Sequence, residues 1–344
     1  MLALKGIATP KVVASGGTVT HYTYSNITYT LHTFRATGTF NVYAKGTTSQ
    51  TFDIFVVAGG GSGGGGSAGG YASNHGSGGG AGGVIWRPAK ALDTGSYTIT
   101  VGATATWPSG NHEGTQGNNS EFGTGGSYIL QALGGGAGAG DPNAKQGNAG
   151  GSGSGTGRDG GNLAGGVAQQ KTASGGHGDS RTYGYGMAGG VAGGTSCRAA
   201  GGGGGAGEAG RNGEADCQTS HATARSSDGG NGIYRFIDGT AGNDNGSAAA
   251  TLAFFNGANA GSGYSDGNIY IAGGGAGAYE GETAFHTATG GRGGGGQGAS
   301  RYGTPGTHAV DSTGSGGGAG QMHGSGVTGG NGGSGIVIIR YVAG

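Results

Sequence analysis

The chain has 344 residues, of which 97 are glycine and 5 are proline, and its 17 basic residues balance its 17 acidic ones. Collagen needs glycine at every third position and abundant proline, so this composition excludes a collagen triple helix. The zero net charge gives no electrostatic cause for an unfolded chain or for general attraction to nucleic acid.

The beginning of the chain predicts a small antiparallel β region over residues 1–58. Residues 12–14, 18–35 and 39–44 are rich in Thr, Tyr, Val and Phe, and glycines stand near the breaks between them. β-Branched and aromatic residues favour strands, and glycine favours turns. Residues 51–58 follow as a strand with a continuous apolar run, which is typical of a buried strand.

Glycine dominates the second region, residues 59–344. Its densest runs are residues 59–66, 134–140, 201–207, 273–277 and 316–320. Glycine loses more conformational entropy on folding than any other residue, so its wide use makes sense where backbones approach too closely for a Cβ atom. We therefore predict a polyglycine II sandwich, in which extended helices of three residues per turn, like polyproline II, keep their N–H groups and hydrogen-bond to several neighbours. Each such bond contributes only about 1 kcal/mol net, so many are needed.

Short strand-like segments separate the glycine runs, and no convincing amphipathic helix is present. The strand-like segments are residues 83–86, 96–101, 127–133, 233–237 and 268–272. An apolar strand over residues 335–342 closes the sandwich, and we predict that it pairs near residues 52–57. The expected fold class is thus mostly β and irregular, with little or no α-helix.

Polar stretches also lie between the glycine runs and are too hydrophilic to form a core. They are residues 104–121, 141–185, 208–228, 238–264 and 279–311. They are long for connections in a compact domain, and long loops on a rigid scaffold are usually functional. We therefore expect the functional surface to be built from these loops.

Aromatic side chains in the polar stretches are the candidate recognition residues. Most of them stand next to Gly, Arg or His, and exposed aromatics beside polar groups suit contacts with glycans or protein loops. The alternative is that they cap the glycine lattice and seal its edges. The candidates for receptor binding are Trp107, His112, Tyr183, Tyr185, Tyr279, Phe285 and Tyr302.

Enzyme motifs match this sequence only trivially. Ser62 fits the G-x-S-x-G hydrolase pattern, but any serine among glycines does so, and no strand–elbow–helix context surrounds it. His112 and Glu113 begin like a zinc-protease motif, but no histidine follows four residues after His112. No carboxylate pair stands out for glycoside hydrolysis by a depolymerase. The sequence predicts no enzymatic activity, no cofactor and no metal site.

An ordered set of segments resembles the glycine-rich domain family of bacteriophage tail and virion proteins. The set comprises residues 18–20, 29–34, 38–40, 53–57 with 59–66, 95–102, 230–233 and 330–341. This family is similar in design to the adhesins at the tips of T-even-like phage long tail fibres, which carry a polyglycine II sandwich whose distal loops bind host receptors. The resemblance implies a non-enzymatic tail-fibre protein or related adhesin, made in the host cytoplasm and located in the virion.

The resemblance also implies the partners. They are other virion or tail-fibre proteins or further copies of the chain, and a protein or glycan on the host surface. No nucleic-acid partner is expected, and no apolar run approaches the roughly 18 residues of a membrane span. Those adhesins carry a sizeable N-terminal attachment domain, whereas here the glycine region starts at residue 59. A purely structural subunit, such as a capsid decoration, head fibre or self-assembling filament, is therefore the alternative.

Two cysteines, Cys197 and Cys217, flank the glycine run at residues 201–207. A disulfide between them would close a loop of about 20 residues and contribute ~3 kcal/mol. The alternative is a pair of free thiols, because phage proteins fold in a reducing cytoplasm. Two thiols alone do not make a structural zinc site.

Overall fold

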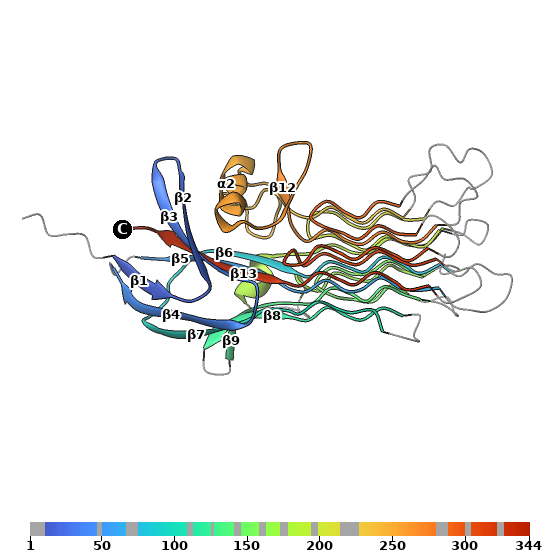
Figure 1. Cartoon of the computed structure of the whole chain (residues 1–344), viewed down its shortest axis with the longest axis horizontal. Helices are drawn as coiled ribbons and strands as arrows, with labels where there is room; N and C mark the ends of the chain where they lie inside the picture. Colours follow the sequence, from blue (N-terminus) through green and yellow to red (C-terminus); the bar gives the residue numbers. More distant parts are fainter. Residues whose placement is uncertain are drawn as a thin grey trace, which may run out of the picture.

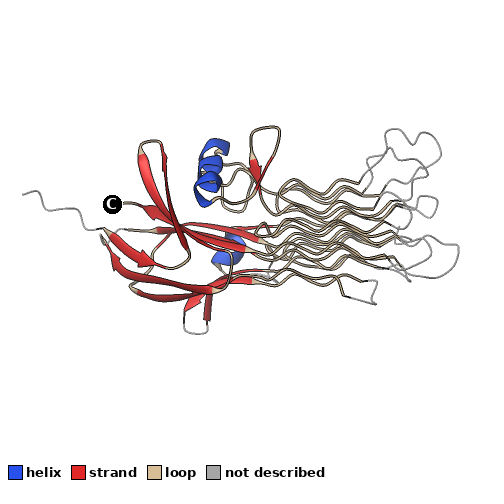
Figure 2. Ribbon diagram, in the orientation of Figure 1, coloured by secondary structure: helices blue, strands red, loops and turns tan. Residues whose placement is uncertain are grey.

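The computed structural model is elongated, with strands gathered at one end and extended glycine-rich segments running side by side from them to the other (Figure 1). We call these the sheet end and the distal end. The residues described are 11–46, 50–66, 75–108, 113–124, 127–140, 146–157, 163–172, 178–193, 199–213, 227–279, 288–299, 304–321 and 327–344. In this part of the chain, antiparallel strands and short helices account for the regular structure (Figure 2), which confirms the predicted mostly β fold with little α-helix.

The first sheet has five antiparallel strands in the order β1-β4-β7-β8-β9. They are β1 (Val12–Ser15), β4 (Gly38–Lys45), β7 (Gly95–Thr100), β8 (Ser120–Thr124) and β9 (Ser127–Ala132). The strands β1 and β4 come from the expected β region, whereas the other three follow the first glycine run. The sheet therefore draws on both sides of the boundary expected at residue 58.

The second sheet has six antiparallel strands in the order β10-β6-β5-β13-β3-β2. They are β2 (Thr18–Tyr24), β3 (Ile27–Phe34), β5 (Phe52–Val57), β6 (Val84–Lys90), β10 (Gly184–Tyr185) and β13 (Ile336–Val342). The register places Ile338 opposite Phe55, which confirms the predicted pairing of the C-terminal strand with residues 52–57. The other edge of β13 pairs with β3, so both ends of the chain meet at the centre of this sheet.

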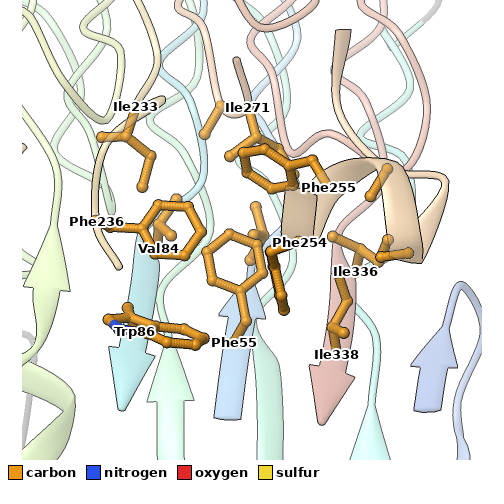
Figure 3. Packing of buried hydrophobic residues seen from close by; sticks show 14 of the residues in the cluster. Phe55, Val84, Trp86, Ile233, Phe236, Phe254, Phe255, Ile271, Ile336 and Ile338 are labelled. Atoms are coloured by element: carbon orange, nitrogen blue, oxygen red, sulfur yellow. The ribbon is translucent and has the colours of Figure 1, made fainter. Parts of the chain in front are cut away.

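Two hydrophobic cores flank the second sheet. One lies between the sheets, where Phe40, Phe52 and Val337 are among its buried members. The other lies on the opposite face, where Phe55 and Trp86 pack against Phe236, Phe254 and Phe255 (Figure 3). The sheet end is therefore held by ordinary apolar burial, which contributes roughly 25 cal/mol for each Å² of apolar surface removed from water.

A helix, α2 (Ala248–Ala258), supplies two of these core rings. It lies inside residues 238–264, which we predicted to be too polar for a core, and that prediction was wrong. The Ser247 side chain caps the helix by accepting a hydrogen bond from the Ala250 N–H at 3.1 Å. Phe254 and Phe255 then reach Phe55 with ring centroids 5.6 and 5.8 Å away. The smaller elements are α1 (Asp179–Thr182), β11 (Ser262–Gly263) and β12 (Ile269–Tyr270).

The glycine-rich segments are polyglycine II helices, which we call rods. Along residues 58–64 the backbone N–H groups donate in rotation to three neighbouring rods. The donor and acceptor pairs are Ala58–Gly83, Gly61–Gly80 and Gly64–Ser77, then Gly59–Asn118 and Ser62–Thr115, then Gly60–Gly333 and Gly63–Gly330. Each neighbour recurs at every third residue, which is the period of a helix with three residues per turn.

Close approach of the rods explains the glycine content. A Cβ atom added at Gly275 would lie 1.9 Å from the Gly317 carbonyl oxygen, and one at Gly203 would lie 2.0 Å from that of Gly79. The obstacle in both cases is backbone, which cannot move aside as a side chain can. The lattice is thus held by backbone hydrogen bonds and contact between main chains, as the composition predicts.

Candidate functional site: the distal rim

The described ends of the rods form a rim at the end opposite the sheets, which we call the distal rim. The hydrogen-bond register gives the direction of each rod: residues 314–321 run parallel to residues 59–66, and residues 75–83 run antiparallel to them. The paired rim residues at which rods stop and resume are Gly66 and His75, Pro108 and Glu113, Gly140 and Gln146, Gly157 and Leu163, Gly193 and Ala199, Gly213 and Ser227, Tyr279 and Ala288, Ala299 and Thr304, and Gln321 and Val327. The segments that join each pair lie outside the described residues.

Backbone bridges fix the rods to one another at the rim. Isolated antiparallel bridges join Gly66 to Val327, His75 to Gln321 and Ala199 to Tyr279. Just inside the rim, small apolar side chains replace glycine hydrogens in a buried cluster. That cluster comprises Ala278, Ala299 and Ala319. The joining segments therefore begin and end at positions that are held rigidly in three dimensions.

Trp107 lies at the rim, as the sequence-based hypothesis of distal aromatics requires, but its ring serves the lattice. The backbone N–H of Trp107 donates to the Asn331 Oδ1 atom at 2.8 Å. Cβ atoms added at Gly65 and Gly329 would lie 2.8 and 2.9 Å from atoms of the indole ring. Its indole nitrogen is buried and has no hydrogen-bond partner among the described residues. The half-buried ring thus seals an edge of the lattice, which is the alternative role that the sequence left open.

Tyr279 is also at the rim and is buried, with 7% of its surface exposed. Its backbone N–H donates to the Ala299 carbonyl at 3.1 Å, and its backbone bridges to Ala199. The structure therefore brings Trp107 and Tyr279 to the same end of the molecule, as fixed parts of the rim's base.

His75 and Gln321 are rim residues that sequence reasoning missed. Both side chains are fully buried, and the two residues face each other across a backbone bridge. The side-chain amide of Gln321 has no hydrogen-bond partner among the described residues, although native proteins satisfy most buried polar groups. The signal in the sequence was a large polar residue at the end of a glycine run. This signal did not single out His75 and Gln321, because several polar residues stand at the ends of glycine runs in this chain.

Tyr183 and Tyr185 lie at the sheet end, so the expectation that they are exposed beside the other candidates needs correction. Tyr185 belongs to β10 and is 1% exposed within the core on the outer face of the second sheet. Burial raises the pKa of its hydroxyl, and the nearby Asp244 carboxylate adds to this. Tyr183 is half-buried beneath the guanidinium of Arg87, whose Cζ lies 4.6 Å from its ring centroid. Residues 181–185 run from the second half of α1 into β10 of the second sheet, away from the rim.

The remaining predicted residues lie outside the described part of the chain. They are His112, Phe285, Tyr302, Cys197 and Cys217. Their flanking residues belong to the rim, because Glu113, Ala199 and Ala288 each begin a rod that returns to the sheet end. Receptor contact by these side chains, and the bonding state of the two cysteines, stay predictions.

Charge is sparse among the described rim residues. Glu113 accepts a hydrogen bond from the Asn148 Nδ2 atom at 3.1 Å. Within the described ranges, no three His, Cys, Asp or Glu side chains gather as they would around a metal ion. The described rim thus consists mainly of backbone and small or buried side chains.

A family model described as a glycine-rich domain matches residues 35–342, which span the rods and most strands of both sheets. No curated protein matches the chain. None of the helices in the described ranges has the length and apolar character needed to cross a membrane.

Proposed function

The chain belongs to the glycine-rich domain family, and from this premise we propose that it is a non-enzymatic bacteriophage tail-fibre protein or related adhesin. It resides in the virion and binds a protein or glycan receptor on the bacterial surface. The segments between the distal rim residues make the contact, and the glycine lattice fixes the residues at which they begin and end.

The observation that carries this proposal is that the molecule has two different ends. Lys11 and Gly344 lie together at the sheet end, where a Cβ atom added at Gly344 would be 3.2 Å from the Lys11 Cγ atom. The C-terminus and the distal rim are at opposite ends of the molecule (Figure 1). An adhesin needs such a division, because one end must serve the particle while the other meets the host.

Rigidity of the base supports the same function. Ordering a loop side chain on binding costs about 0.5–1.5 kcal/mol, so a surface whose anchor points are already fixed loses less affinity to ordering. Rods hydrogen-bonded to several neighbours provide such anchors. Because backbone groups hold the rods together, the lattice does not depend on the side chains of the joining segments. One scaffold can thus present different receptor-binding segments.

Binding of the purified full chain to host cells tests the proposal. Labelled chain is expected to bind cells saturably and to block adsorption of the phage particle, while releasing no sugar from host polysaccharide. A chain that binds no cells and that electron microscopy with antibody labelling places along the capsid or within a filament would instead support the purely structural role.

A further inference from the structure

Three of the four edges of the two large sheets are protected from further pairing. The β1 edge has only four residues and a bulge between Val13 and Ala14. The β10 edge has two residues. At the β9 edge, the Gln131 N–H donates to Ser180 Oγ at 3.0 Å, and the Gln170 amide donates to the Gln131 carbonyl at 3.3 Å. Short, bulged or covered edges are the devices by which proteins prevent association through open strands.

Within the described part of the chain, the fourth edge, β2, has none of these devices. It runs over seven residues, Thr18–Tyr24, without a bulge, a proline or a residue of fixed charge. Its side chains at Val19, His21 and Thr23 are exposed, with 48% of Val19 accessible. The hairpin that it forms with β3 projects from the body of the sheet end (Figure 1).

The turn of this hairpin determines which backbone groups of β2 face outward. Ser25 and Asn26 both have positive φ, at 48° and 62°, as a two-residue type I′ turn requires. Tyr24 and Ile27, which flank the turn, are then a hydrogen-bonded pair, and hydrogen-bonded pairs alternate along the ladder. The N–H and C=O groups of Val19, His21 and Thr23 therefore point away from β3, and none of them has a backbone partner among the described residues.

We propose that two copies of the chain associate through β2, which pairs antiparallel with β2 of the second copy about His21. In this register His21 lies opposite His21 of the partner subunit, and Val19 lies opposite Thr23 of the partner subunit. The three outward residues on each side satisfy one another's backbone groups. The second sheet then continues from one protomer into the other.

The sequence of β2 makes a second copy the occupant of this edge. Val19 and Thr23 are both β-branched, and such side chains pack well on a pleated sheet. The strand β2 has no fixed charge, so self-pairing places no like charges opposite each other, which would be destabilising. The pairing leaves the distal rim free, because β2 lies at the sheet end.

Cysteine cross-linking tests the register. In a background carrying Cys197→Ser and Cys217→Ser, the His21→Cys variant should form an intermolecular disulfide, because directly opposed residues in a hydrogen-bonded pair have Cα atoms about 5.5 Å apart. Val19→Cys alone and Thr23→Cys alone should not cross-link, because their own copies lie four positions away along the ladder, but a mixture of the two should.

Mass measurement in solution tests the association itself. The wild-type chain should have twice its 32.5 kDa chain mass at high concentration, and the Val19→Lys/Thr23→Lys double variant should have the single mass. Val13→Lys is the matched control, because Val13 is 52% exposed on the protected β1 edge, and it should remain dimeric. Unchanged thermal unfolding should show that all variants fold. A wild-type chain that stays monomeric, a lysine variant that stays dimeric, or equal cross-linking of all single cysteine variants would overturn the proposal.

Discussion

Arg340 and Asp53 form a largely buried ion pair that joins β13, near the C-terminus, to β5. The Arg340 Nε and Nη2 atoms lie 2.8 and 2.6 Å from Asp53 Oδ2, across directly opposed positions of β13 and β5. Their side chains are only 9% and 19% exposed. Arg340 also donates to the Tyr22 hydroxyl at 2.7 Å. Its guanidinium therefore links β13 to both β5 and β2 of the second sheet.

Removing one member of this pair should be costly. Arg340→Met leaves the Asp53 carboxylate, which is only 19% exposed, without its charged partner. We expect a loss of roughly 3 kcal/mol in the free energy of unfolding, the lower end of the range for a buried pair, because Asp53 Oδ1 keeps its hydrogen bond from the Ala89 N–H. The double variant Arg340→Met/Asp53→Asn should lose less, because no unpaired charge stays buried. Urea unfolding of the single and double variants measures both. Asp93→Asn, in the exposed pair with Lys45, is the control and should change stability by less than about 1 kcal/mol; a similar loss there would contradict the role given to burial.

The lattice should distinguish glycines by the space around them. Gly275→Ala places a methyl group 1.9 Å from a backbone oxygen, whereas at Gly157 the nearest atom to an added Cβ is 3.7 Å away. We expect Gly275→Ala to destabilise the chain by roughly 1–3 kcal/mol or to prevent folding, as overpacking does. Gly157→Ala should leave the melting temperature near that of the wild type. Equal behaviour of the two variants in thermal unfolding would mean that the rods are not in close contact.

His32 should make stability depend on pH. Burial of its ring lowers the pKa of the imidazole, an effect partly offset by a hydrogen bond to the Gly16 carbonyl at 2.7 Å and reinforced by nearby His21. The unfolded chain then takes up a proton below about pH 6.5 that the native chain does not. Stability should therefore be greatest above that pH and fall, by up to about 1.4 kcal/mol for each pH unit, as the pH drops towards the lowered native pKa. His32→Gln should flatten this part of the stability profile in urea unfolding, and parallel profiles would contradict the assignment.

Gln170 should behave as a structural part of the β9 edge. Its side chain accepts from the Leu133 N–H at 2.8 Å and donates to the carbonyls of Gln131 and Ser180. Gln170→Leu has a similar volume but leaves the Leu133 N–H and the Gln131 and Ser180 carbonyls without this partner. Each unsatisfied buried group should lower the free energy of unfolding by roughly 1–3 kcal/mol. Gln169→Leu, on the adjacent half-buried residue, is the control and should have little effect. Equal midpoints of urea unfolding for the two variants would contradict this structural role of Gln170 at the β9 edge.

The rods and the pairing of β13 with β5 could be predicted from the sequence, because each follows from the residue types in one segment of the chain. Glycine runs predict helices in close contact, and the apolar runs at residues 52–57 and 336–342 predict strands that need burial. Which rods are neighbours could not be predicted, because Gly61 donates to Gly80 although nothing in a glycine distinguishes that partner from any other.

The errors have a similar cause. Consecutive Phe254 and Phe255 give no helical period, so α2 stayed hidden in a polar stretch. Tyr185 looked exposed because Gly and Arg surround it in sequence, but two residues of strand pairing with β6 carry it into the core. At the rim, Trp107 was singled out by its type as a receptor-binding candidate, which stays a prediction. The burial of Gln321 depends on contacts between rods that sequence spacing does not reveal.

Recognition at the distal rim is tested most directly by comparing cell binding for two variants of the full chain that keep the wild-type melting temperature. One replaces residues 109–112 and 280–287, which join rim residues, with Gly-Ser sequence of equal length; the other carries Tyr43→Ser on the 62% exposed tyrosine of the sheet end. We predict that the first variant binds host cells at least tenfold more weakly, a change of about 1.4 kcal/mol, and that the second binds as the wild type does. Full binding by the first variant together with loss of binding by the second would contradict recognition at this end of the molecule.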